Sequence, residues 1–337
     1  MDSLPPSCLW GKIMGALPDG REAARAACVS PSSAEGLPFS RWFRAVRLTR
    51  AGEALEPASG TFDAELRADA IDAERAAALD AVPDGGCVLL RPGEHVALTV
   101  HIAAHRTVCV FGRGAATIVT ATPPPPAPTG YAPGGNRHYL LRVTNAHAIV
   151  DGVTFRPLAD DAAVFVVGLS HLVLTRCAVD ATHIADNNCC YQIWCDYGIV
   201  LLRMIECRLV GAGKKNNGGV IAIMSIRKVT VELVACDISA FGVGVDAFVD
   251  GHVTLTSCTI HNNKIGVDVS SDYLSSFTGN LRDNTIHNNE IGLRITGASD
   301  YDVDVTGTAF HANKSDVRTY HGARMPRGFK HVISTRK

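Results

Sequence analysis

Short apolar segments recur in the second half of the chain with a step of roughly 22 to 30 residues. Each segment pairs a register residue, often cysteine, with an apolar residue two positions later. The pairs are Val153 and Phe155, Cys177 and Val179, Cys207 and Leu209, Cys236 and Ile238, Cys258 and Ile260, Asn284 and Ile286, and Thr308 and Phe310. Side chains two positions apart share one face of a strand, so both columns are expected to point inward. One coil cannot bury its apolar face alone, so the repeat predicts a solenoid of stacked parallel strands.

Four register positions of this repeat are cysteines, namely Cys177, Cys207, Cys236 and Cys258. Cysteine behaves as a small apolar side chain when it is buried, which suits a column along the axis of the solenoid. Such a column would be closed to solvent. We therefore interpret these cysteines as packing residues rather than as redox or metal-binding groups.

A second column is expected at a turn that follows each repeat. It contains His261-Asn262-Asn263, His287-Asn288-Asn289 and His311-Ala312-Asn313. Asparagine tolerates the left-handed backbone of a turn and can bond to the adjacent coil, so Asn263, Asn289 and Asn313 predict a ladder. Three aligned histidines could bind a metal, but we favour a surface decoration of the turn.

The first 62 residues have a different pattern. Leu9, Ile13 and Leu17 recur at helical spacing, and further helices are expected over Arg21–Val29 and Arg41–Arg50, so residues 1–48 predict a small helical domain. Residues 49–62, with Gly, Pro and Ser, predict a linker.

A β-helix is expected over residues 63–320. It would open with a capping helix over Asp63–Val82 and continue with strands such as Cys87–Leu90, Val96–Ile102 and Val108–Phe111. Residues 121–138 are rich in proline and predict a loop inserted between coils. The basic residues 321–337 predict a solvated tail.

Composition narrows the classes of function. The chain has 337 residues, 47% of them hydrophobic and 19% charged, with a formal net charge of −1, which argues against a nucleic-acid-binding surface. Eleven cysteines without a signal segment, a long apolar stretch or a paired CxxC motif indicate a reduced, cytoplasmic protein with no membrane span. We expect no cofactor and no structural zinc.

The segments Asn262–Val267 (NNKIGV) and Asn288–Leu293 (NNEIGL) resemble the repeats of the pectin-lyase-like β-helix superfamily. The region Ala70–Gly112 resembles the N-terminal cap and first coil of its carbohydrate-binding and sugar-hydrolase branch. The resemblance implies a mainly β fold, a right-handed single-stranded parallel β-helix. It does not decide the activity, because this superfamily holds lyases, hydrolases, epimerases and non-enzymatic binders.

The N-terminal segment resembles an F-box. The matching residues are Leu4, Pro5, Leu9, Ile13, Leu17, Ala27-Cys28-Val29 and Trp42. The resemblance implies docking to the adaptor of a cullin-RING ubiquitin ligase through Leu4, Pro5, Leu9, Ile13, Leu17 and Val29. An F-box ahead of a β-helix is similar to a class of ubiquitin-ligase receptors and to proteins of large amoeba-infecting DNA viruses. The latter likeness implies the cytoplasm of an infected cell, or the virion. The alternative is a short helical cap of the β-helix.

One column offers candidate chemistry. Asp246, Asp268 and Arg294 each lie between two apolar residues, and their spacings match the coil steps, so we expect them to stack on neighbouring coils and face outward. Two carboxylates could serve glycoside cleavage, or hold Ca²⁺ beside a basic residue in a lyase. The alternative is a solvated face on which Arg294 balances Asp268.

The sequence thus favours a non-catalytic binding or adaptor protein, whose β-helix recognises a substrate protein or a glycan. The second hypothesis is a polysaccharide lyase or glycoside hydrolase that uses Asp246, Asp268 and Arg294, with Ca²⁺ as cofactor only in the lyase case. A third is a structural role, for example in a virion, which association into a homo-oligomer would favour.

Overall fold

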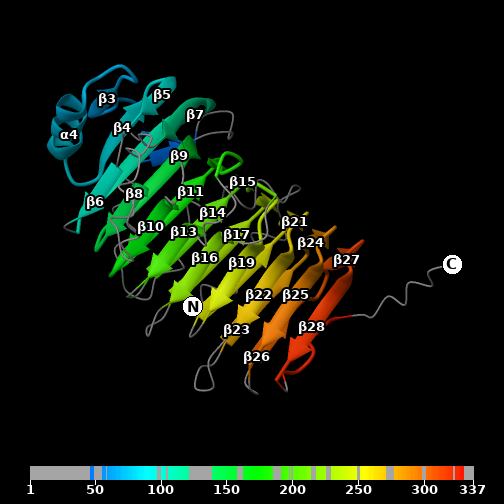
Figure 1. Ribbon diagram of the computed structural model, residues 1–337. Helices are drawn as coiled ribbons and strands as arrows, with labels where there is room; N and C mark the ends of the chain where they lie inside the picture. Colours follow the sequence, from blue (N-terminus) through cyan, green and yellow to red (C-terminus); the bar gives the residue numbers. More distant parts are fainter. Residues whose placement is uncertain are drawn as a thin grey trace, which may run out of the picture.

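The chain forms a parallel β-solenoid, shown by a computed structural model (Figure 1). The structure describes residues 46–48, 55–57, 59–96, 100–103, 105–120, 139–157, 162–184, 191–196, 198, 200–213, 218–224, 229–248, 251–270, 277–297, 301–321 and 323–329. Each coil contributes one strand to each of three parallel sheets, which we name sheets 1, 2 and 3. The chain passes from sheet 2 to sheet 3, then to sheet 1, and returns to sheet 2 one coil further along.

Sheet 1 has nine strands. They are β6 (Val100–Ala103), β8 (Tyr139–Thr144), β10 (Ala162–Val167), β13 (Tyr191–Asp196), β16 (Gly218–Met224), β19 (Val243–Phe248), β22 (Ile265–Ser270), β25 (Ile291–Thr296) and β28 (Ser315–Tyr320).

Sheets 2 and 3 share two long strands that bend from one sheet into the other, β7 (Thr107–Thr120) and β9 (His147–Arg156). Sheet 2 adds β3 (Ala64–Leu66), β4 (Gly86–Leu90), β11 (Ser170–Thr175), β14 (Val200–Ile205), β17 (Val229–Val234), β20 (Gly251–Thr256), β23 (Phe277–Arg282) and β26 (Tyr301–Asp304). Sheet 3 adds β5 (Gly93–Val96), β12 (Ala178–Asp180), β15 (Arg208–Val210), β18 (Asp237–Ser239), β21 (Thr259–His261), β24 (Thr285–His287) and β27 (Ala309–His311).

The predicted register of the repeat is confirmed. The second position of each sequence pair lies opposite its equivalent in the next coil, from Phe155 and Val179 through to Ile286 and Phe310. The residue before each register position takes a left-handed backbone, as at Gly152 (φ 64°) and Arg176 (φ 49°). That conformation produces the sharp corner between sheets 2 and 3.

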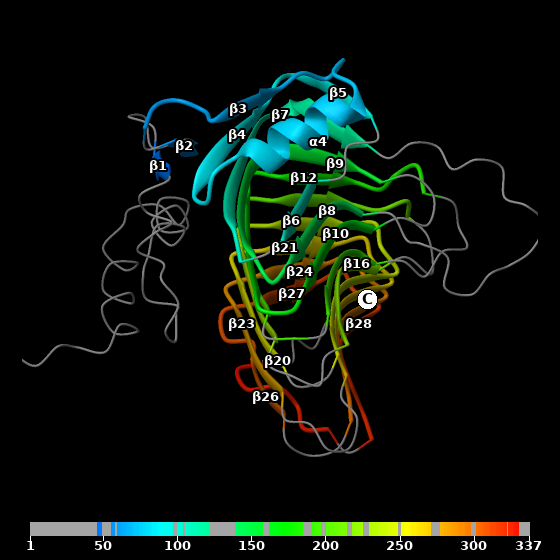
Figure 2. The same cartoon turned by 90° about the vertical axis from the view of Figure 1, so that its left-hand side faces the viewer.

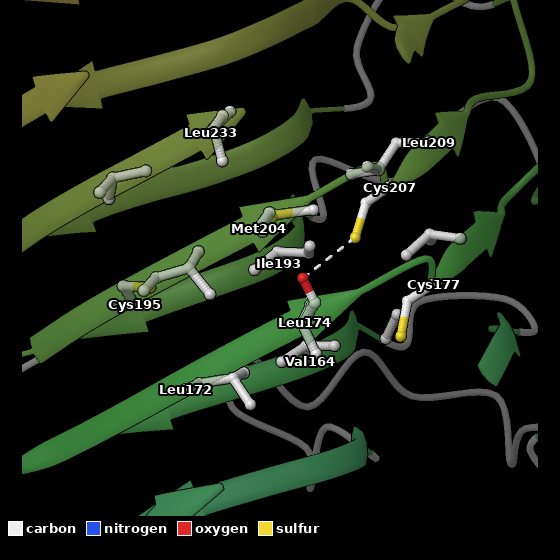
Figure 3. Packing of buried hydrophobic residues seen from close by; sticks show 14 of the residues in the cluster. Val164, Leu172, Leu174, Cys177, Ile193, Cys195, Met204, Cys207, Leu209 and Leu233 are labelled. Carbon is white, nitrogen blue, oxygen red and sulfur yellow. Dashed lines mark hydrogen bonds between the residues drawn. The ribbon is translucent and has the colours of Figure 1, made fainter. Parts of the chain in front are cut away.

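The cysteine column lies inside the solenoid, as predicted, and each thiol has a hydrogen-bond acceptor. Cys207 Sγ donates to Leu174 O at 3.4 Å (Figure 3), and Cys236 Sγ donates to Met204 O at 3.5 Å. Asn284 occupies the same column and donates through Nδ2 to Leu255 O at 2.9 Å. The register side chain therefore adds a hydrogen bond to a main-chain carbonyl of the preceding coil, from the inside of the solenoid.

The asparagine ladder is also confirmed, with one correction. The amide of Asn263 donates to Asn289 Oδ1 at 2.9 Å, and the amide of Asn289 donates to Asn313 Oδ1 at 2.9 Å. The left-handed backbone belongs to the preceding residue of each triplet, as at Asn262 (φ 55°) and Asn288 (φ 54°). The ladder asparagines are needed inside because their side chains bond main-chain groups in the neighbouring coils.

The helix α4 (Asp72–Ala81) closes the N-terminal end of the solenoid (Figure 2). Its Leu79 packs against the core, and its buried Arg75 donates to Ala68 O at 3.1 Å. The expected helix over Asp63–Val82 is wrong at its start, because Ala64–Leu66 forms β3 and pairs in parallel with β4. Buried Leu66 gains more from extending the core than a helical turn would provide.

The chain before β3 differs from the expected helical domain where it is described. Val46–Leu48 forms β1, which pairs antiparallel with β2 (Leu55–Pro57), so the third helix is wrong for these residues. The other two expected helices and the proline-rich loop at 121–138 lie outside the described residues.

The C-terminal end also differs from the expected solvated tail. Arg327 forms a parallel bridge with Asp304, and its amide donates to Val303 O at 2.8 Å. The Phe329 ring packs edge-on against Phe310, with the ring centroids 5.6 Å apart. Residues 323–329 therefore cover part of the last coil, because its core would otherwise be open to water.

Candidate functional site

The three residues of the predicted site lie side by side on sheet 1. Asp246 of β19, Asp268 of β22 and Arg294 of β25 occupy equivalent positions in consecutive strands, and Arg318 of β28 continues the row. The flanking Val267 and its equivalents are fully buried in the core, so the row is on the outer side of the sheet. The predicted stacking of the row is therefore confirmed.

Asp268 and Arg294 form a two-point ion pair. Arg294 Nε donates to Asp268 Oδ1 at 2.8 Å, and Arg294 Nη2 bonds the other carboxylate oxygen. The hydrogen bond that Arg294 donates to Asp268, with the charges of Asp268 and Asp246, raises the pKa of Arg294. Asp268 is only 3% exposed, so its carboxylate bonds Arg294 and has little contact with water.

This geometry does not suit acid–base catalysis. A glycosidase needs one carboxyl group that gives up a proton and a second that accepts a proton or attacks the sugar. The guanidinium of Arg294 engages both oxygens of Asp268, which ties that carboxylate to a fixed cation instead of leaving it to a reacting sugar.

Calcium does not fit the row either. Ca²⁺ takes six to eight oxygen ligands, and the positive Arg294 engages both oxygens of one candidate ligand, Asp268. Among the residues that the structure describes, no group of three or more His, Cys, Asp or Glu side chains is arranged to hold a metal ion.

An aromatic and arginine cluster lies further along the same row, toward the N-terminal end of sheet 1. Phe165 lies opposite Arg142 of β8 and Trp194 of β13. The Phe165 ring stacks on Tyr139 with centroids 4.5 Å apart and meets Trp194 edge-on at 6.0 Å. The Arg142 guanidinium carbon is 5.9 Å from the centre of the Phe165 ring. Phe165 and Trp194 are half-buried, and Arg142 is exposed.

The sequence did not reveal this cluster. Counting coil steps back from Asp246 would have reached it, but β13 and β16 are paired with a register shift between Ile193 and Cys195. An irregular step of this kind breaks the count. The alternation of apolar residues also concealed Phe165 and Trp194, because two aromatic side chains in a strand are ordinarily assigned to the core.

A cleft of about 630 Å³ opens on a different part of the solenoid, where sheet 2 turns into sheet 3. Its walls come from the segment Glu56–Phe62 and from the corners of the first coils, including Phe111, Arg113 and Arg176. Arg176 is oriented by the buried Asp151, whose Oδ1 accepts from Arg176 Nε at 3.0 Å and from the Thr175 hydroxyl at 2.8 Å. None of the residues of the predicted row lines this cleft.

The predicted histidine column lies on sheet 3. The rings of His261 and His287 stack with centroids 5.0 Å apart, and His261 Nε2 lies 2.9 Å from Asp237 Oδ1. A second pair, His147 and His171 on sheet 2, has ring centroids 4.9 Å apart. Burial lowers the pKa of His171 to about 4, and the neighbouring His147 and Arg203 add to the effect.

The residues predicted to bind an adaptor lie outside the described residues. They are Leu4, Pro5, Leu9, Ile13, Leu17 and Val29. No helix within the described part of the chain is long and apolar enough to cross a membrane.

Comparison with known proteins identifies no family for this chain. No family model and no curated protein matches the sequence. Among solved structures, the chain matches the A-module of the mannuronan C-5 epimerase AlgE4 from Azotobacter vinelandii with 14% identity and a TM-score of 0.27. The match covers 74% of this chain and 92% of that module. A likeness of this size carries no argument about the activity of this protein.

Proposed function

We propose that this protein is a non-catalytic adaptor. In this proposal, the solenoid binds a partner protein on the outer side of sheet 1, and the N-terminal segment docks to the adaptor of a cullin-RING ligase. The observation that carries the proposal is the cluster of Tyr139, Arg142, Phe165 and Trp194 on a face that would otherwise be polar.

The chemistry of the cluster favours a protein as the partner. Tyrosine, tryptophan and arginine dominate the residues that contribute most to binding at protein interfaces. The aromatic rings of this cluster support one another, so they would lose little conformational entropy on binding. The exposed Arg142 offers a guanidinium to a carboxylate of the partner, next to an apolar contact on Phe165.

The charged half of the row favours binding over catalysis. The ion pair between Asp268 and Arg294 presents a face whose charges are largely balanced. Such a face can be covered by a partner without leaving a buried unpaired charge, which would cost several kcal/mol, on the order of 3 to 5. The exposed Arg318 would add a rim charge that affects the rate of association more than the affinity.

The docking half of the proposal rests on the F-box resemblance of residues 4–29. We also propose that the solenoid winds right-handed and is pectin-lyase-like, as the resemblance of Asn262–Val267 and Asn288–Leu293 implies. The proposed location is the cytoplasm of an infected cell, or the virion. Purified full-length protein mixed with the purified ligase adaptor should form a stable complex in titration calorimetry. The variant Leu9→Glu/Ile13→Glu should not bind, and no binding by the wild-type protein would refute the docking half.

The recognition half needs a separate experiment. Proximity labelling with the full-length protein should identify a set of partners that disappears in the variant Phe165→Ser and persists in the control Arg208→Ser, which changes an exposed residue of sheet 3. Binding of the wild-type solenoid to a glycan array instead would replace the protein partner by a carbohydrate. Turnover of polygalacturonate or alginate, with or without Ca²⁺, that is abolished by Asp268→Asn would establish the enzyme hypothesis instead.

A further inference from the structure

The outer side of sheet 2 changes character along the solenoid. One row of equivalent positions reads Cys87, Cys109, Ile149, Val173, Arg203, Glu232, Thr254, Asn280 and Asp304 from the first coil to the last. The first four side chains are apolar, and the remaining five are polar or charged. A sheet face that meets water is polar, so the early coils have the composition of a covered face.

The apolar end forms a cluster of its own, separate from the core inside the solenoid. We call it the outer cluster, and it consists of Cys87, Leu89, Cys109, Phe111, Ile149 and Val173. Each of these side chains is 8% exposed or less, although all lie on the outer side of their strands. Of the described residues, Phe62 packs against the cluster, with its ring edge-on to Phe111 at a centroid distance of 5.5 Å.

The chain that enters the solenoid runs over this face. The segment Glu56–Phe62 lines the same cleft as Phe111 and Arg113. The strand β2 pairs antiparallel with β1, so the chain at Val46 is also held near this face (Figure 2). The 45 residues before Val46 thus end beside the outer cluster, and Phe39, Trp42 and Phe43 are the large apolar residues closest to that point in the sequence.

We propose that the N-terminal segment of the same chain, through Phe39, Trp42 and Phe43, packs on the outer cluster and fixes the N-terminal segment to sheet 2. This inference does not depend on what residues 4–29 bind. Figure 2 shows β4 of sheet 2 and β8 of sheet 1 on opposite sides of the solenoid. A segment anchored on sheet 2 would therefore leave the aromatic cluster of sheet 1 accessible to a partner.

The natural cysteines of the chain serve as reporters for the test. Cys87 and Cys109 belong to the outer cluster, whereas Cys177, Cys207, Cys236 and Cys258 lie in the core. In the full-length variant Phe39→Ser/Trp42→Ser/Phe43→Ser, native-state alkylation of Cys87 and Cys109, followed by mass spectrometry, should accelerate by roughly tenfold or more. The core cysteines should stay slow, which shows that the solenoid remains folded. The control Leu9→Ser/Ile13→Ser/Leu17→Ser should react as the wild type does.

Two results would overturn the inference. One is an unchanged rate at Cys87 and Cys109 in the first variant while the core cysteines stay protected. The other is protection that grows with protein concentration in the wild type, since a second copy would then cover the cluster. If the variant fails to fold, hydrogen exchange on the unmodified protein decides: packing predicts slow exchange in the peptide that contains Phe39 to Phe43, and fast exchange there contradicts it.

Discussion

The buried histidine His171 should make the solenoid sensitive to mild acid. It is 6% exposed on sheet 2, and its pKa is lowered from 6.5 to about 4, chiefly because burial penalises the charged imidazolium. The folded protein therefore keeps this imidazole neutral at a pH where the unfolded chain already binds a proton. The free energy of unfolding is therefore highest above pH 6.5. It falls as the pH drops from 6.5 toward 4, because the unfolded chain gains a proton that His171 in the folded protein does not.

The size of the effect follows from the shift. The pKa of His171 is about 2.5 lower in the folded than in the unfolded state. This difference reduces the free energy of unfolding by about 3 kcal/mol at a pH well below 4, and by about 2 kcal/mol at pH 5. The total stability of a protein is typically about 5 to 15 kcal/mol, so the loss should be easy to measure. Arg203 lies close enough to contribute to the shift and would repel the imidazolium further.

Urea unfolding at pH 8 and pH 5, followed by circular dichroism, tests this prediction. The variant His171→Phe keeps a ring beside His147 and cannot take up a proton. Its free energy of unfolding should fall between the two pH values by about 2 kcal/mol less than that of the wild type. The control His321→Phe removes an exposed histidine and should lose stability as the wild type does. An equal pH dependence in His171→Phe and the wild type would refute the reasoning.

Three further substitutions test the packing of the solenoid by urea unfolding. Asn289→Ala removes the side chain that bonds the Asn263 amide and Ile260 O, and it should cost about 3 kcal/mol. The exposed Asn288→Gly should cost less than about 0.5 kcal/mol, and equal losses would refute the ladder. Arg294→Met leaves the buried Asp268 unpaired and should lower the free energy of unfolding by about 3 kcal/mol. The double variant Asp268→Leu/Arg294→Met should regain most of that stability, and no recovery would contradict this prediction. Cys236→Val keeps the shape but removes the thiol donor, so a loss of about 1 kcal/mol is expected, and no loss would mean that the bond contributes nothing.

The solenoid could be predicted because its signal is repeated. An apolar column that recurs through Val179, Leu209 and Ile238 constrains the register at every coil, and one coil confirms the next. The cysteine and asparagine columns followed from the same register. Their hydrogen bonds to neighbouring coils did not, because sequence gives the face of a side chain but not the main-chain group that it meets.

The ends of the solenoid were harder to predict because each occurs once. Ala64–Leu66 has residues that favour a helix, yet it forms β3 since Leu66 completes the first layer of the core. Residues 323–329 are basic in composition but include Phe329, which packs on the last coil. In both places the open end of the core overrides the local preference.

The position of the candidate site was predicted, but the contacts of its carboxylates were not. Spacings that match the coil steps placed Asp246, Asp268 and Arg294 in one row, and the strand pairing confirms it. Spacing alone could not tell whether the carboxylates would face a ligand or an arginine. The distances show that Arg294 engages both oxygens of Asp268.

The central claim is that the outer side of sheet 1 binds a partner protein and does not turn over a substrate. The most direct measurement is the quantitative comparison of proteins labelled by the wild-type full-length chain and by Phe165→Ser, with Arg208→Ser on sheet 3 as the control. The account predicts a defined set of partners that Phe165→Ser loses, while labelling of the ligase adaptor is the same in all three. Identical partner sets for the wild type and Phe165→Ser would contradict it.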